Sequence, residues 1–198
     1  TTGNTDSNVR GNYMDTVRAK LTLAHAADTP SGSSSVGSEQ TVAKFVASNS
    51  ANVGNYDVTL ELLNFDVASS GVSLGSTATL NVYMNSVSTN NLVATTDYPI
   101  TPGGARNYTD TQFADADFDD TSDGEVVVSA GSSRTILVTL ETNDSGFAAN
   151  ETLSVGLQAN SNDGAIASVV WLDGVGGASS ALYYTVDTLP LAGKTLVY

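Results

Sequence analysis

The sequence predicts an all-β protein: a two-sheet sandwich of about ten strands, immunoglobulin-like or jelly-roll in topology. Three observations predict this class. Apolar and polar residues alternate with period two in segment after segment, and Gly, Ser, Asn and Asp separate these segments. No segment keeps a helical period for three turns.

In the first half of the chain, alternation predicts strands over residues 17–23, 43–47, 56–67, 78–84 and 92–98. The apolar phase of the third strand changes at Leu62–Leu63, because Leu60 and Leu62 carry the pattern before this point and Leu63 and Phe65 carry it afterwards. One extra residue at that position is typical of a β-bulge.

In the second half, strands are expected over residues 126–128, 136–140, 153–157, 165–171, 182–186 and 194–198. The segment 165–171 is nearly continuously apolar, so we expect both of its faces to be covered. Residues 99–124 form the longest stretch without a strand pattern and contain Pro99, Pro102 and most of an acidic cluster. They predict a long acidic surface loop.

Composition restricts the compartment and the partners. The chain of 198 residues carries 21 acidic and 7 basic residues, a formal net charge of −14, which disfavours nucleic acid and anionic membranes as partners. No apolar run approaches the roughly 18 residues of a transmembrane segment. The chain has no cysteine, is rich in Ser, Thr and Asn and begins at Thr1, as would a secreted protein without its signal peptide or an excised fragment. We expect an extracellular or cell-surface location.

The segment DADFDDTSDGE, residues 115–125, is the candidate metal site. Calcium prefers six to eight oxygen ligands, and five carboxylates here could supply several of them: Asp115, Asp117, Asp119, Asp123 and Glu125. The EF-hand pattern fails, because its sixth position holds Asp120 and its twelfth Val126. A calcium loop and a solvated, self-repelling loop both remain open, and no other cofactor is indicated.

The sequence indicates no enzyme. The letters G-x-S-x-G surround Ser73, but no helical pattern follows, and the sole histidine, His25, ends a strand pattern. Three N-x-S/T triplets mark candidate glycosylation sites at Asn107, Asn143 and Asn150.

The two ends of the sequence favour assembly. Residues 1–16 are polar, and we expect them to be an N-terminal arm ordered by a neighbouring subunit, while residues 17–198 form a single sandwich domain that ends in a strand. Strand addition between copies builds a homopolymer. The expected assembly contacts are Val17, Leu21, Leu23, Leu196, Val197 and Tyr198.

Four segments resemble a β-sandwich domain of uncharacterised surface proteins of candidate-phylum (Patescibacteria-type) bacteria: residues 27–48, 128–142 (VSAGSSRTILVTLET), 167–174 (ASVVWLDG) and 188–198 (TLPLAGKTLVY). The resemblance implies an extracellular sandwich without known enzyme activity. The architecture is also similar to that of strand-exchanging filament subunits of the TasA/camelysin type. The leading hypothesis is therefore a subunit of an extracellular filament, pilus-like fibre or surface layer. The alternative is a carbohydrate-binding or adhesin module, with or without calcium.

Overall fold

The computed structural model describes residues 18–51, 56–73, 79–97, 105–107, 126–140, 142, 146–159, 169–173, 182–183 and 186–198. Within these ranges the chain is all-β, with one short 3-10 turn, η1 (Thr89–Asn91). The strands are β1 (Leu21–His25), β2 (Gly32–Ser33), β3 (Gln40–Asn49), β4 (Val58–Leu63), β5 (Phe65–Ser70), β6 (Thr79–Met84), β7 (Leu92–Asp97), β8 (Ala105–Asn107), β9 (Val127–Val128), β10 (Ser133–Leu140), β11 (Thr152–Leu157), β12 (Val169–Leu172), β13 (Leu182–Tyr183) and β14 (Leu191–Val197).

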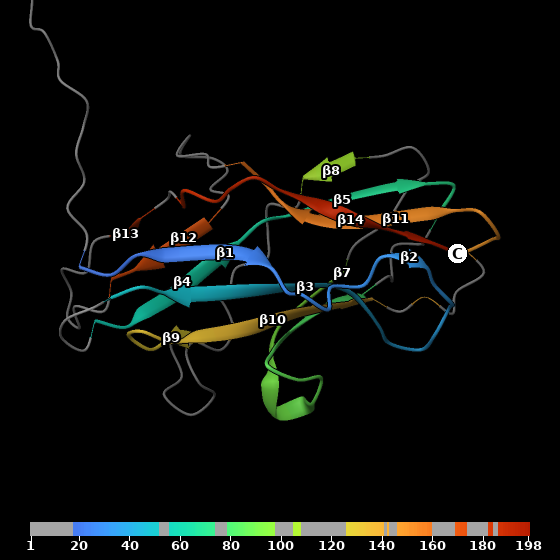
Figure 1. Cartoon of the computed structure of the whole chain (residues 1–198). Coiled ribbons are helices and arrows are strands. Elements are labelled where there is room, and N and C mark those ends of the chain that lie inside the picture. The colour runs from blue at the N-terminus through green and yellow to red at the C-terminus, as the bar shows by residue number, and fades with distance from the viewer. Residues whose placement is uncertain are drawn as a thin grey trace, which may run out of the picture.

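One layer is a five-stranded antiparallel sheet, sheet A, with the order β1-β3-β10-β6-β7. The long strands β3 and β10 form its middle, and β1 and β7 are its two edges (Figure 1). Alternation places Ala43, Phe45 and Ala47 of β3 in the core and turns Lys44 and Val46 to the other face. Strand β3 therefore has one buried face, as the period-two pattern predicts, whereas β10 also buries Leu137 and Thr139 on the other face.

The second layer consists of sheet B (β2-β14-β11-β5-β8) and sheet C (β13-β12-β4-β9). Apart from β2, each strand of sheet B has a counterpart at the same place in sheet C, and the two are consecutive in the sequence. The pairs are β13 and β14, β11 and β12, β4 and β5, and β8 and β9, and β4 continues into β5 through Asn64. Figure 1 shows sheet C at the left and sheet B at the right. Within the described residues, β4 thus continues directly into β5 and joins sheet C to sheet B.

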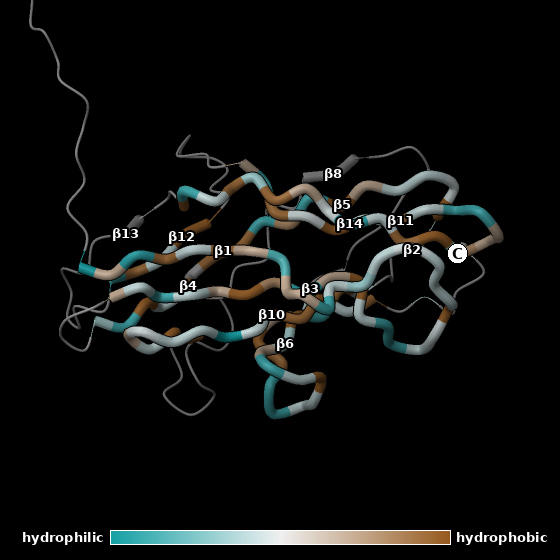
Figure 2. Tube along the Cα trace, in the orientation of Figure 1, coloured by the Kyte–Doolittle hydropathy of each residue, from teal (hydrophilic) through white to brown (hydrophobic). Residues whose placement is uncertain are grey.

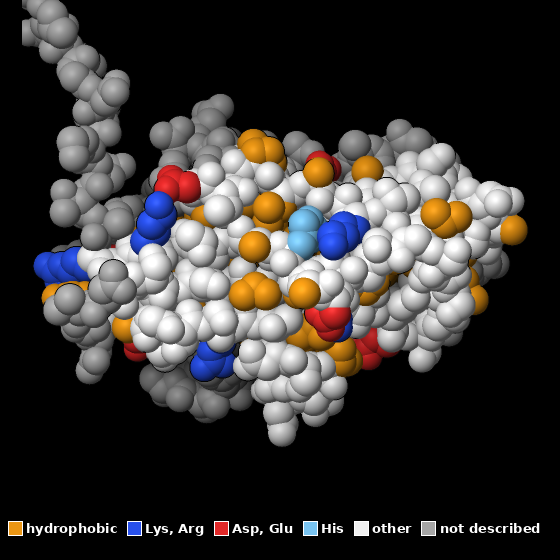
Figure 3. Space-filling model, in the orientation of Figure 1, with side chains coloured by type: hydrophobic (Ala, Val, Ile, Leu, Met, Phe, Trp, Pro, Cys, Tyr) orange, Lys and Arg blue, Asp and Glu red, His pale blue; other side chains and the backbone are white. Residues whose placement is uncertain are grey.

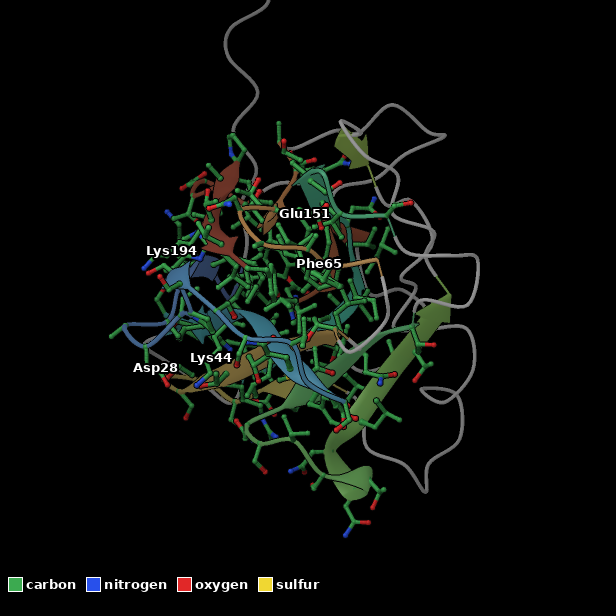
Figure 4. The ribbon with its side chains drawn as sticks, turned by 90° about the vertical axis from the view of Figure 1, so that its right-hand side faces the viewer. Asp28, Lys44, Phe65, Glu151 and Lys194 are labelled. Carbon is green, nitrogen blue, oxygen red and sulfur yellow. The ribbon has the colours of Figure 1, made fainter. Side chains whose placement is uncertain are left out.

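The core lies between the layers, and one hydrophobic cluster joins residues of all three sheets. Phe45 of sheet A stacks on Phe65 of sheet B, with 6.1 Å between ring centroids, and both rings are fully buried. Figure 4 shows Phe65 in the interior, whereas Lys44 and Lys194 lie at one face. Figure 2 shows the same division, with hydrophobic residues concentrated in the strands and hydrophilic ones in the turns. The predicted all-β sandwich is confirmed.

The predicted bulge is present one residue earlier than expected. In the β12–β4 ladder Val170 pairs with Leu62 and Trp171 with Leu60, so Glu61 is the extra residue. Two other expectations differ from the structure. In β12, Val170 and Leu172 are only partly buried, so one face is not fully covered. Strand β8 lies inside the stretch 99–124 for which only a loop was expected, because pairing with β5 overrides the weak local pattern of Ala105–Asn107.

The pairing of β11 with β14 predicts a sharp sensitivity to glycine replacement. A Cβ on Gly156 would lie 2.6 Å from the backbone nitrogen of Gly193 and would also meet the carbonyl oxygen of Leu191. Gly156→Ala should therefore lower the free energy of unfolding by about 1–3 kcal/mol, as overpacking does. Urea unfolding measures the change. Gly37→Ala is the matched control, because a Cβ there meets nothing within 4 Å; equal stabilities of the two variants would contradict the close approach.

Candidate assembly surface

The sheet edges are the places where this fold can accept a further strand. Sheet A ends in β1 and β7, sheet B in β2 and β8, and sheet C in β13 and β9. Strand β7 has six residues and β1 has five, whereas the other four edge strands have only two or three. Only β1 and β7, among the described strands, offer an edge of useful length.

Strand β7, with the sequence LVATTD, has no partner on its outer side within the part of the chain that the structure describes. Natural edge strands are usually protected by Lys, by Pro or by a covering segment. This strand contains neither Lys nor Pro, and its one charge is Asp97 at its end. The strand therefore lacks the usual residues that protect an edge from pairing.

The outward backbone groups of β7 follow from the ladder beside it. The N–H of Asn85 donates to the carbonyl of Thr135 at 2.7 Å, so this pair is hydrogen-bonded across β6 and β10. Along β6, alternate residues direct their backbone N–H and C=O groups to β10 and to β7. Asn85 faces β10, so Val82, three residues earlier, faces β7 and bonds to its partner Ala94 there. The next residue, Thr95, consequently turns its N–H and C=O away from sheet A.

The hairpin between β6 and β7 adds apolar surface next to this edge. Val87 is 44% exposed and Leu92, the first residue of β7, is 39% exposed. The side chain of Asn91 donates to the hydroxyl oxygen of Ser86 at 2.7 Å and holds the hairpin closed. A strand that pairs with β7 would find exposed apolar side chains where the edge begins.

A polar cluster braces β6 and β7 from the outer face of sheet A. The Oε1 atom of Glu39 accepts hydrogen bonds from the Tyr83 hydroxyl, from Thr139 Oγ1 at 3.0 Å and from Asn81 Nδ2 at 3.3 Å. The hydroxyl of Thr95 in turn donates to Asn81 Oδ1 at 2.9 Å. The network therefore runs from the β2–β3 loop across the sheet to its open edge.

The cluster shifts the pKa values of its two titratable groups in opposite directions. The hydrogen bond from Tyr83 lowers the pKa of Glu39, although loss of water around the carboxylate acts in the opposite direction. Burial, together with the bond to Glu39, raises the pKa of Tyr83 to about 12. The stabilisation from Glu39 is therefore complete above its ordinary pKa and is lost as pH falls through the lowered value.

Strand β1 differs from β7, because the segment before β14 covers its outer edge. The N–H of Leu23 donates to Thr188 Oγ1 at 3.0 Å, and His25 Nε2 lies 2.8 Å from the carbonyl oxygen of Ala192. Lys20 pairs with Asp187 at 2.5 Å. Figure 1 shows this C-terminal segment running beside β1, and Figure 3 shows the histidine at the surface next to a basic side chain.

The structure separates the six expected assembly contacts. Leu21, Leu23 and Leu196 lie in the core of their own domain, so we correct the expectation that they fill a groove in a neighbour. Val197 remains 37% exposed, and the ring of Tyr198 is half-buried against Phe147. Val17 lies outside the described residues.

The C-terminal strand is also held within its own sheet. Strand β14 pairs with β11 on one side and, at Leu196 and Val197, with β2 on the other. The backbone of Tyr198 exchanges hydrogen bonds with Asn150 and Glu151. Residues 194–198 are thus occupied in this structure and are not free to act as a donor strand.

The candidate metal and glycosylation residues are mostly outside the described ranges. The acidic residues Asp115, Asp117, Asp119, Asp123 and Glu125 and the glycosylation candidate Asn143 all lie there. Asn107 is on β8, paired with Asp66. Asn150 is exposed in a turn with φ 69°, so its side chain is accessible. Within the described ranges, no three His, Asp or Glu residues gather closely enough to hold a metal ion.

Two comparisons of the sequence, with family models and with curated proteins, give no match. No family model matches the sequence, and no curated protein matches it. In the part of the chain that the structure describes, no helix has the length and apolarity to cross a membrane.

The Tyr83–Glu39 hydrogen bond predicts a specific loss of stability at alkaline pH. An unfolded tyrosine ionises near pH 10, whereas burial and the bond to Glu39 raise the pKa of Tyr83 to about 12, so the stabilisation from the neutral hydroxyl is complete below pH 10 and is lost between 10 and 12. Tyr83→Phe should lower the free energy of unfolding by about 1–3 kcal/mol at pH 7 and should weaken its dependence on pH between 10 and 12. Urea titrations at a series of pH values measure both effects.

Tyr56→Phe is the control, because it removes a tyrosine hydroxyl and leaves the Glu39 cluster intact. Identical alkaline slopes for the wild-type chain and for Tyr83→Phe would contradict the role of this bond.

Proposed function

We propose that this protein is a structural subunit of an extracellular filament, pilus-like fibre or surface layer, and that it polymerises by edge-strand pairing. The observation that carries the proposal is the outer edge of β7, a six-residue strand without Lys or Pro, which no other described strand pairs with. The backbone groups of Thr95 supply hydrogen bonds to an added strand, and the exposed Val87 and Leu92 supply apolar contact.

The donor is residues 1–16 of a neighbouring copy. Contacts are expected from the terminal segments 1–24 and 194–198, but residues 21–24 and 194–198 are already paired within their own sheets. The arm leads into β1, which lies at the opposite edge of sheet A from β7, about 19 Å away at the usual spacing of strands. Sixteen extended residues span up to about 55 Å, which is ample to reach a second copy.

Donation from one edge to the opposite edge is a head-to-tail contact. The last copy at each end of the assembly then has a free arm or a free β7, so that growth continues unless the rotation between copies closes a ring. The absence of cysteine and the Ser-, Thr- and Asn-rich composition support an extracellular location for such a polymer.

Thr95→Pro should abolish polymerisation and preserve the fold. Proline removes the N–H that points outward but spares the ladder to β6, and the extended conformation it favours in Ala94 is already that of a strand. Negative-stain electron microscopy and sedimentation measure the polymer, and thermal melting reports the fold. Thr95→Val is the matched control, because it loses the same hydroxyl bond to Asn81 but keeps the outward N–H. Fibres of wild-type length from the Thr95→Pro variant would contradict the proposal that β7 is the acceptor.

Deleting residues 1–16 should leave a folded chain that no longer polymerises alone. A synthetic peptide of residues 1–16 should bind the deleted chain, and amide exchange at Thr95 should slow when it does. Unchanged fibres after the deletion would exclude the arm as the donor, and the Thr95→Pro result would still decide whether β7 is the acceptor.

A further inference from the structure

The covered edge of β1 is the feature that the proposed function leaves unexplained. Leu23 lies in the middle of β1, and its N–H points away from β3: the N–H of Ala26 bonds to the carbonyl of Lys44, so that alternate residues of β1 face β3 and Leu23 faces outward. This outward N–H is the group that a pairing strand would need. It is occupied by the hydroxyl of Thr188, a residue 165 positions away.

We propose that residues 187–189, the edge guard, close β1 to strand pairing, and that without the guard β1 pairs directly with the open β7 of a second copy. This inference uses one part of the proposed function, namely that β7 accepts a strand from another copy. The guard gives sheet A one accepting edge, so that assembly depends on a separate donor segment. The partner that it excludes is another copy of this chain.

The guard is anchored at both of its ends. Val186 before it is buried in the core and Leu189 packs against the core, while the N–H of Leu189 bonds to the carbonyl of Val186 at 3.2 Å and makes a tight turn. Thr188 and Asp187, at the apex, are exposed. The apex thus reaches β1 through side chains, without forming a strand of its own.

The contacts of the guard are local and individually weak. The ion pair between Lys20 and Asp187 joins side chains that are largely exposed, and such pairs contribute little. The bond from Leu23 to Thr188 is a single neutral hydrogen bond. The contacts of Asp187 and Thr188 with β1 can therefore be removed by substitution without unfolding the sandwich, while Val186 and Leu189 stay packed in the core.

Cysteine crosslinking in the full-length chain can test the proposal, because the chain has no cysteine of its own. Ala24→Cys on β1 and Thr95→Cys on β7 place two thiols on exposed positions at opposite edges of sheet A, too far apart for a disulfide within one copy. Direct pairing of β1 with β7 of a second copy brings the strands to about 5 Å, whereas an intervening arm keeps them about 10 Å apart. Oxidation therefore links copies only where the strands pair directly.

The guard is opened by Thr188→Val together with Lys20→Ala. The opened chain should give a ladder of disulfide-linked oligomers on a denaturing gel, and the chain with an intact guard should give none. A second reporter, Thr22→Cys with Thr95→Cys, covers the alternative register. Amide exchange at Leu23 should accelerate about fivefold in the opened chain that also carries Thr95→Pro and so cannot pair, the equivalent of one neutral hydrogen bond.

Three results would overturn the proposal: no ladder from either reporter after opening, an equal ladder with the guard intact, or unchanged exchange at Leu23. Fibres that form from the wild-type chain and disappear with Thr95→Pro would leave the proposed function standing in each of these cases.

Discussion

Sheet A has to satisfy the backbone hydrogen bonds of its two edge strands, and the rest of the structure depends on how it does so. In the middle of the sheet, β3, β10 and β6 satisfy one another. At one edge the Thr188 hydroxyl accepts the N–H of Leu23, and at the other β7 leaves Thr95 facing outward. An unpaired strand in water loses little, but it offers a template to any extended chain. The two edges of sheet A are therefore not equivalent as sites for an added strand.

The two edges of sheet A are held in place from opposite faces of the sheet. The guard at β1 depends on Val186 and Leu189, which the second layer holds against the core. The open edge depends on the Glu39 cluster, which ties β6 and β7 to the β2–β3 loop from the outer face. A rigid edge costs less entropy when it binds than one that must be ordered first. In the proposed polymer, the core and the Glu39 cluster therefore hold β7 in place before it binds an added strand.

Period-two alternation predicted most of the strands, because a half-buried strand records its two faces in its own residues. The same logic located the bulge at Glu61 to within one residue. It failed for β2, whose Gly32 and Ser33 are exposed and carry no apolar signal. The pattern also could not show whether Leu21, Leu23 and Leu196 are buried in their own domain or in a neighbouring copy. An apolar side chain indicates that it is buried and does not indicate which chain covers it. The Leu23–Thr188 contact joins residues 165 positions apart, and no local pattern predicts it.

Symmetry shows why an open β7 needs a donor of another kind to build a polymer. Two copies could pair β7 with β7 about a two-fold axis, and this contact would close as a dimer. Pairing of β7 with β1 would continue indefinitely, but the guard blocks it at Leu23. Residues 1–16, which precede β1, need neither the β7–β7 contact nor the β7–β1 contact. This donor segment differs from β7, and it begins at the edge of sheet A opposite to β7. Directional growth then follows from the unequal treatment of two edges of a single sheet.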